Sequence, residues 1–364
     1  MPKRGGLLMA GAGLLGTLVV AAGAVCLGSG CSTPAYYAQA VNGHLDLLQR
    51  ARPALEVMAA ADTSPALRER LVLSQRLREF AVTELQLPDN TSYRRYADLA
   101  RSAAVWNVVA TPELSLTLKT WCFPVLGCVG YRGYYTQAAA ETLAAELRQQ
   151  GLETRVYGVP AYSTLGYSNW AGGDPLLNTF INWPEADLAK LIFHELTHQV
   201  VYASDDTTFN ESFATAVERI GGRRWLQGQP QGAAALTALQ QHEQRQQDFH
   251  DLTQRYRSEL QALYAGTAGD DDKRRHKAEL MARLRAEYSS LKAQRWAGYA
   301  GYDPWFANAN NAYFAVLAAY TELVPEFERL FVRQGSDLVR FYAEVRRLAA
   351  LPKDQRRASL AAAP

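Results

Sequence analysis

The segment from Leu188 to Val201 places two histidines and a glutamate inside a run that is apolar almost all round. Its large apolar residues cover every face of a helix: Leu188, Leu191, Ile192, Phe193, Leu196, Val200 and Val201. A helix with so little polar surface is buried in the core. The polar residues in it must therefore lie inside the protein or on the floor of a cleft, where they need partners.

Two of these polar residues have the spacing of metal ligands. His198 follows His194 by four positions, in the segment His-Glu-Leu-Thr-His. Residues four apart share one face of an α-helix, so both imidazoles can reach one metal ion, with Glu195 beside them. This spacing predicts a hydrolase that binds one Zn²⁺, with Glu195 as its general base.

Glu211 is the predicted third zinc ligand. It lies in Asn210-Glu211-Ser212-Phe213-Ala214, at the start of a second helix that we expect to be capped by Thr208 and to end at Gly221. A short connection would turn this helix back along the first and bring Glu211 to the histidines. The alternative is that Thr208 and Glu211 form a capping box, in which Glu211 only satisfies the helix start.

The N-terminus predicts export. Lys3 and Arg4 precede an uncharged apolar run from Leu7 to Leu27, which small residues follow. This pattern predicts a signal peptide over residues 1–30, with an uncleaved anchor helix as the alternative. Lys3 and Arg4 also account for the whole excess of basic over acidic residues, 38 against 36. The composition thus gives no reason to expect nucleic acid as a partner.

Cys31 resembles the lipidated cysteine of bacterial lipoproteins, which becomes the N-terminus of the mature chain. Gly28 stands where that signal usually has leucine, and Leu27 lies one position further back. The alternative is an ordinary residue just past a conventional cleavage site. The resemblance implies a lipid anchor on Cys31 and a periplasm-facing protein of the cell envelope, and Ser32 favours the outer membrane.

Cys122 and Cys128 are the two cysteines outside the leader and its end. They lie six positions apart, with Pro124 and Gly127 between them to bend the chain. In an exported protein such a pair predicts a small-loop disulfide. A metal or redox pair is the weaker alternative, because further cysteines and histidines are missing nearby in the sequence.

The periodicity predicts an α+β fold that is predominantly α. The pattern is helical from Tyr36 to Leu87 and at 93–102 and 137–150, and it has strand character at 105–109, 154–157 and 161–167. We expect the two later strands to lie at an edge or bulge, where one of them could receive an extended peptide beside the metal helix; an ordinary loop is the alternative. A small sheet would thus accompany the two ligand helices.

Two helical regions follow. Residues 232–292 predict a long antiparallel helical hairpin without a catalytic signature, in which Leu236 and Leu239 on the first helix would face the second. The predicted divisions of the chain are a helical N-terminal region at 31–104, a zinc hydrolase core with the disulfide loop at 105–231, the hairpin, and a C-terminal helical region at 293–364 that completes the site.

The two motifs resemble those of the gluzincin metallopeptidases, which include thermolysin and the zinc aminopeptidases. With the leader and the segments Trp121–Pro124 and Gly130–Tyr135, they resemble a family of zinc aminopeptidase lipoproteins of Gram-negative bacteria. The resemblance covers most of the mature chain and implies a peptide substrate. Two departures stand out: only 12 residues separate His198 from Glu211, and Thr215 stands where thermolysin-like enzymes often have an acid that supports the first histidine.

The resemblance also implies an oxyanion stabiliser, often tyrosine or histidine. Tyr313, in Asn310-Asn311-Ala312-Tyr313-Phe314, is the candidate, and a packing role is its alternative. The competing function for the whole chain is that of a non-catalytic envelope lipoprotein that binds a partner through the hairpin.

Overall fold

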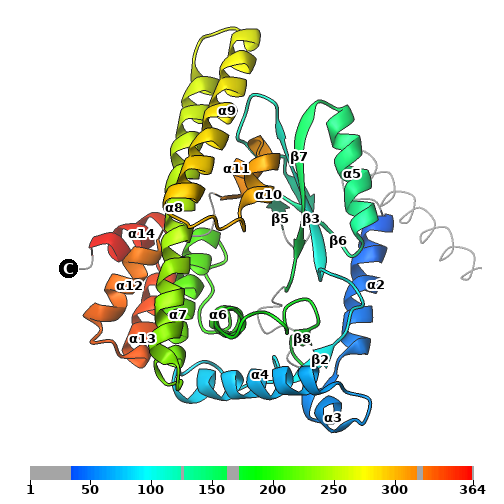
Figure 1. Cartoon of the computed structure of the whole chain (residues 1–364), viewed down its shortest axis with the longest axis vertical. Coiled ribbons are helices and arrows are strands. Elements are labelled where there is room, and N and C mark those ends of the chain that lie inside the picture. Colours follow the sequence, from blue (N-terminus) through cyan, green and yellow to red (C-terminus); the bar gives the residue numbers. More distant parts are fainter. Residues whose placement is uncertain (1–33, 124–126, 162–171, 318–322, 363–364) are drawn as a thin grey trace, which may run out of the picture.

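The computed structural model describes residues 34–123, 127–161, 172–317 and 323–362 (Figure 1). The predicted signal peptide at 1–30, the predicted lipidation site Cys31, and most of the predicted strand at 161–167 lie outside these ranges. The described chain is predominantly helical with small sheets, which confirms the predicted fold class. Within these ranges no helix combines the length and the apolar character needed to cross a bilayer.

The N-terminal region is helical as predicted, up to residue 83. Its helices are α2 (Pro34–Arg50), α3 (Ala54–Ala59) and α4 (Pro65–Thr83). The helix predicted at 93–102 is wrong, because residues 95–97 form a strand. Tyr93 and Ala100 have φ angles of 63° and 51°, which a right-handed helix does not allow.

This strand belongs to a small sheet. The order is β1 (Arg52–Pro53), β2 (Arg95–Ala97) and β8 (Leu176–Leu177), with β2 antiparallel to β1 and parallel to β8. The pairing of β2 with a segment about 80 positions later satisfies its backbone and overrides the local helical pattern.

A second sheet has the order β6 (Arg132–Tyr134), β3 (Val105–Pro112) and β7 (Leu152–Val159), and all its pairs are antiparallel. Helix α5 (Gln137–Gln149) packs on one face against Trp106, Val108 and Ala110. The strands predicted at 105–109 and 154–157 and the helix predicted at 137–150 are confirmed. Because side chains alternate, Asn107, Arg155 and Tyr157 lie on the other face, and β7 is an edge strand.

The predicted disulfide is also confirmed. Strands β4 (Trp121–Phe123) and β5 (Gly127–Val129) pair as a hairpin, and Cys122 and Cys128 are joined across it. Phe123 contacts Tyr36 of α2, with ring centroids 5.6 Å apart. The disulfide therefore joins two strands, of which β4 contacts the N-terminal helix through Phe123.

The main core surrounds two central helices, α6 (Glu185–Thr197) and α7 (Thr207–Gln227) (Figure 1). Helix α4 packs against α6. The C-terminal helices pack against α7 and one another: α12 (Val324–Arg333), α13 (Leu338–Ala349) and α14 (Lys353–Ala362). The same core holds Leu47 near the start of the described chain and Leu360 near its end.

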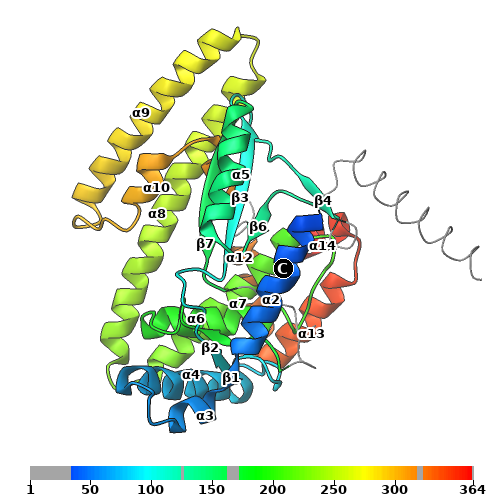
Figure 2. The same cartoon turned by 90° about the vertical axis from the view of Figure 1, so that its right-hand side faces the viewer.

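The predicted helical hairpin is confirmed as α8 (Gly232–Ala265) and α9 (Asp270–Gln294), which lie side by side in Figures 1 and 2. Short helices α10 (Asp303–Asn308) and α11 (Asn311–Leu317) complete a second core with it. One expectation is wrong: Leu236 and Leu239 pack into the main core instead of facing α9. The N-terminal part of α8 thus packs against the central helices, and only its C-terminal part pairs with α9.

Candidate metal centre and active site

Helices α6 and α7 lie antiparallel in close contact. Glu211 contacts His194 and His198, Glu218 contacts His194, and the Trp225 indole donates a hydrogen bond to Glu185. As α7 advances, its partners on α6 thus move back toward the start of that helix.

Glycine allows this close approach. A Cβ added to Gly221 would lie 2.8 Å from a ring carbon of Phe193 and 2.6 Å from a methyl of Leu85. The prediction that α7 ends at Gly221 is therefore wrong, because the helix continues to Gln227 and uses this glycine for packing.

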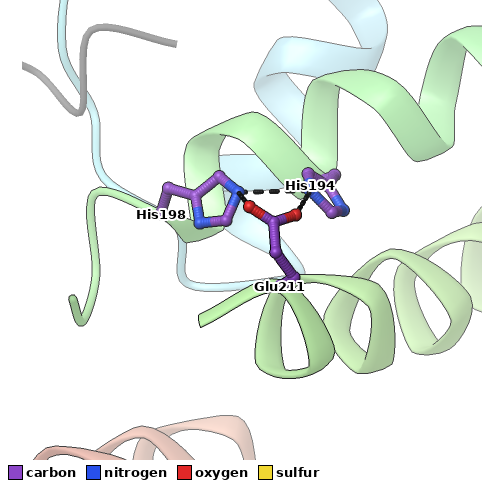
Figure 3. Close-up of side chains that lie close together, drawn as sticks. All are labelled: His194, His198 and Glu211. Carbon is purple, nitrogen blue, oxygen red and sulfur yellow. Dashed lines mark hydrogen bonds and ion pairs between the residues drawn. The ribbon is translucent and has the colours of Figure 1, made fainter. Parts of the chain in front are cut away.

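The start of α7 leaves the Glu211 carboxylate available. Asp206 caps the helix, since its carboxylate accepts a hydrogen bond from the Phe209 N–H at 3.2 Å. Thr208 lies within the first turn, so its predicted role as the cap is wrong and the capping box does not form. Glu211 instead directs its carboxylate toward the two histidines (Figure 3).

The three predicted ligands converge on one point (Figure 3). The Nε2 atoms of His194 and His198 lie 3.2 Å apart, and the Glu211 oxygens lie 3.3 Å from His194 Nε2 and 3.7 Å from His198 Nε2. A tetrahedral zinc with bonds of about 2.0–2.2 Å would hold its ligand atoms about 3.3–3.6 Å apart. The donor types and their spacing therefore fit one zinc ion.

Glu218 holds the first histidine in place. Its carboxylate lies 2.8 Å from His194 Nδ1, the ring nitrogen that faces away from the ligand cluster. A carboxylate in this position fixes the ring orientation and raises the basicity of a ligating histidine. Thr215 cannot supply the acid that supports the first histidine in thermolysin-like enzymes. Glu218, one turn further along α7, supplies it instead. His198 differs, because its Nδ1 is buried and has no partner among the described residues.

The electrostatics of the cluster favour a cation. Burial lowers the pKa of His194, but the carboxylates of Glu211 and Glu218 outweigh it and hold that pKa well above 6.5. Burial and His194 together lower the pKa of His198 to about 4. Burial raises the pKa of Glu211, but its contacts with the two histidines lower it overall. A metal cation can replace the proton that these groups attract.

Glu195 lies next to the cluster in a poorly solvated place. Burial raises its pKa to about 7, while His194 opposes this shift and the charges of Glu211, Asp174 and Glu218 add to it. A carboxyl group with a pKa near neutrality can both accept and release a proton at working pH, as a general base requires.

A cavity of about 560 Å³ opens beside these residues. His194, Glu195 and Glu218 line one part of it, and the rest is lined by the first half of α6 together with His242 and Gln246 of α8. A second cavity of about 360 Å³ shares Asp187 and His242 with it, so the two continue along the space between α6 and α8. A volume of this size fits a short peptide or another small ligand.

Two candidate tyrosines, Tyr313 and Tyr131, have different surroundings. Arg155 of β7 lies between the rings of Tyr157 and Tyr313, at 4.8 and 4.5 Å from their centroids. The pKa of Tyr131 is raised, first by burial and then by the charges of Tyr157, Tyr202 and Glu211. Tyr313 has ring contacts with Arg155 and Trp305, so its catalytic role stays a prediction.

Glu218 and the α8 residues that line the cavity were not predicted from the sequence. Glu218 follows Glu211 by seven positions, two helical turns along the same face, and this spacing was a usable signal. No comparable signal marked His242, because its position depends on how α8 packs on the central helices.

Comparison with known proteins agrees with the geometry. A family model described as "Putative aminopeptidase" matches residues 35–360, which include all three candidate ligands and Glu195. Comparisons with curated proteins and with solved structures gave no match. Since the family model spans nearly all of the described chain, this protein belongs to the family of putative aminopeptidases.

Proposed function

We propose that this protein is a zinc-dependent aminopeptidase that hydrolyses peptide bonds. Family membership supports a peptidase acting on a peptide substrate. The observation that carries the zinc assignment is the convergence of His194, His198 and Glu211, with spacings that fit one zinc ion. The neighbouring cavity supports the same proposal, since a substrate needs room next to the metal.

In this proposal His194, His198 and Glu211 hold the ion. Bound zinc supplies Lewis acidity, which polarises a carbonyl group and lowers the pKa of water. Glu195 removes the proton from the attacking water and delivers it to the leaving amine, and its pKa of about 7 suits both transfers. Glu218 keeps the His194 ring oriented throughout.

Two tyrosines are candidates for stabilising the developing oxyanion. Tyr131 is supported by the influence of the Glu211 charge on its pKa and by its exposed side chain. Tyr313 remains the second candidate, from the resemblance to gluzincins. The comparison of Tyr131→Phe with Tyr313→Phe separates them: loss of an oxyanion donor lowers kcat by roughly 100- to 1,000-fold, with little change in bound zinc.

The primary test measures metal content and peptide cleavage by the purified protein. We expect one zinc per chain, cleavage that a chelator abolishes, and loss of cleavage in Glu195→Gln with zinc retained. Glu279→Gln, at an exposed position on α9, is the matched control and should be fully active. A folded wild-type protein that binds no zinc would refute the proposal.

We also propose that the protein is exported and carries a lipid on Cys31, which would anchor it to the cell envelope facing the periplasm, in the outer membrane. The support is the basic and apolar leader that precedes Cys31, and Ser32 after it. Mass spectrometry of the mature N-terminus tests this, and a lipid should be found on the wild type and be absent from Cys31→Ser.

The competing function, partner binding through the hairpin, receives less support. His242 and Gln246 of α8 line the same cavity as Glu195, so the first half of α8 takes part in the proposed active site. Residues that served only to bind a separate partner would not need to line this cavity.

A further inference from the structure

Lys190 is a buried lysine in the wall of the cavity that contains Glu195. Only 8% of its surface is exposed, which is unusual for lysine. Its stem lies over Gly222 of α7, where an added Cβ would be 3.4 Å from Lys190 Cγ. The stem is therefore held between α6 and α7, and Lys190 is one of the residues that line the cavity.

No ion pair holds this ammonium among the described residues, although Asp187, Glu195 and Glu218 line the same cavity. No carboxylate among them lies within 4.0 Å of Lys190 Nζ, although Asp187 lies one turn earlier on the same helix. The nearest turn of α7 offers Glu218, whose carboxylate contacts His194 instead. A lysine ammonium that lines a cavity and forms no ion pair is available to pair with an anion that enters the cavity.

Lys190 is also the one lysine or arginine among the described residues that line this cavity. His242, across the cavity on α8, has a lowered pKa, first because it is buried and then because Lys190 is near. The neighbouring imidazole is thus held neutral at neutral pH. Lys190 therefore carries the positive charge of this part of the cavity, whose acidic lining residues are Asp187, Glu195 and Glu218.

The position of Lys190 along α6 sets its distance from the metal cluster. Lys190 precedes His194 by four residues, which corresponds to a distance of about 6 Å along the helix axis. An extended peptide advances about 3.3–3.6 Å per residue. An anion on Lys190 would thus lie about two residues from a peptide bond held at the metal cluster.

We propose that Lys190 binds a carboxylate of the substrate and so selects short peptides that end, or carry an acidic side chain, about two residues from the scissile bond. This inference rests on the proposed peptidase function and adds a substrate class to it. The shared chemistry is a carboxylate, and its two possible sources are the peptide C-terminus and a glutamate or aspartate side chain.

Binding is measured in the Glu195→Gln protein loaded with zinc, by calorimetry, so that no peptide is cleaved. The probes are trialanine, trialanine amide, and the α-amide of alanyl-alanyl-glutamic acid, in which the side-chain carboxylate belongs to the second residue after the first peptide bond. We expect trialanine or the glutamyl peptide to bind roughly 10- to 100-fold more tightly than trialanine amide, as a charge-assisted hydrogen bond would produce. The tighter of the two carboxylates identifies the source.

Adding Lys190→Met should abolish this preference without weakening the amide, because methionine keeps most of the stem and removes the charge. Lys190→Arg should restore part of the preference. Lys119→Met, at an exposed lysine outside the cavity, is the control and should retain all of it. Bound zinc is measured in each variant, so that a folding defect is recognised by zinc loss.

A carboxylate preference that persists in Lys190→Met would overturn the inference, since the metal or another group would then bind the carboxylate. Equal binding of the three peptides by the protein with Lys190 intact would also overturn it. The proposed function fails separately, if the wild type cleaves none of the peptides while Glu195→Gln still shows binding that depends on Lys190.

Discussion

Replacing Glu195 with glutamine should stabilise the metal-free protein while it abolishes catalysis. Burial raises the pKa of this carboxyl from its usual 4.5 to about 7. Each tenfold change in proton affinity is worth about 1.4 kcal/mol, so the native state loses about 3 kcal/mol at alkaline pH by holding this group ionised. Glutamine has nearly the same shape and carries no charge, and it removes most of this loss.

The pH dependence has a definite sign. Between pH 4.5 and about 7 the unfolded chain ionises Glu195 while the folded protein keeps it protonated, so stability falls as the pH rises. The gain from Glu195→Gln should be small at pH 4.5 and reach about 3 kcal/mol at pH 8. Urea unfolding in the presence of a chelator measures it at both values.

Glu211→Gln provides a matched comparison of opposite sign. Contacts with the histidines lower the pKa of Glu211, so its ionised form stabilises the native state, and this stability is present above pH 4.5 and lost as the pH falls through the lowered value. Glu211→Gln should therefore destabilise the metal-free protein at pH 8. If Glu195→Gln instead destabilised it at pH 8, or stabilised it equally at both pH values, the argument from burial would be refuted.

Three further predictions concern the frame of the site. Glu218→Gln should weaken zinc affinity about 10- to 100-fold in a competition titration with a chelating dye, with the fold unchanged; unchanged affinity would contradict its supporting role. Gly221→Ala should destabilise the protein by about 1–3 kcal/mol in urea unfolding, whereas Gly222→Ala should be neutral or stabilising because its Cβ has ordinary contacts; equal effects would contradict the packing argument. Serine at both Cys122 and Cys128 should cost about 2 kcal/mol and leave zinc binding intact, and loss of zinc would contradict a purely local role for this loop.

The parts of the site that the sequence predicted correctly depend on local periodicity. The helical spacing of His194 and His198 is a property of one segment, and Glu211 was identified as the residue a short connection would return to them. The same local reasoning found the hairpin. It failed at 93–102, where the backbone of β2 pairs with Leu176 and Leu177 from a distant part of the chain.

Other residues could not be assigned without the packing of the helices. Glu218 contacts His194 only because α7 lies antiparallel to α6 in one register, which Gly221 permits. Lys190 appears in the sequence as one of several polar residues in α6; its burial depends on the packing of α7, and the cavity beside it depends on the position of α8. Contacts between helices follow from the shapes of both surfaces, which no single segment contains.

The contact between α8 and the active site also changes how the two candidate functions can be separated. Deletion of the whole hairpin would remove His242 and Gln246 from the cavity and so abolish either function. Substitutions at the exposed tip avoid this problem, because Asp271 is fully exposed there and far along the chain from the cavity residues. If Asp271→Ala together with Arg275→Ala abolished the biological phenotype while peptide cleavage stayed intact, partner binding would be the essential role; a phenotype lost in His242→Ala and Glu195→Gln but kept in the tip variant would establish the peptidase.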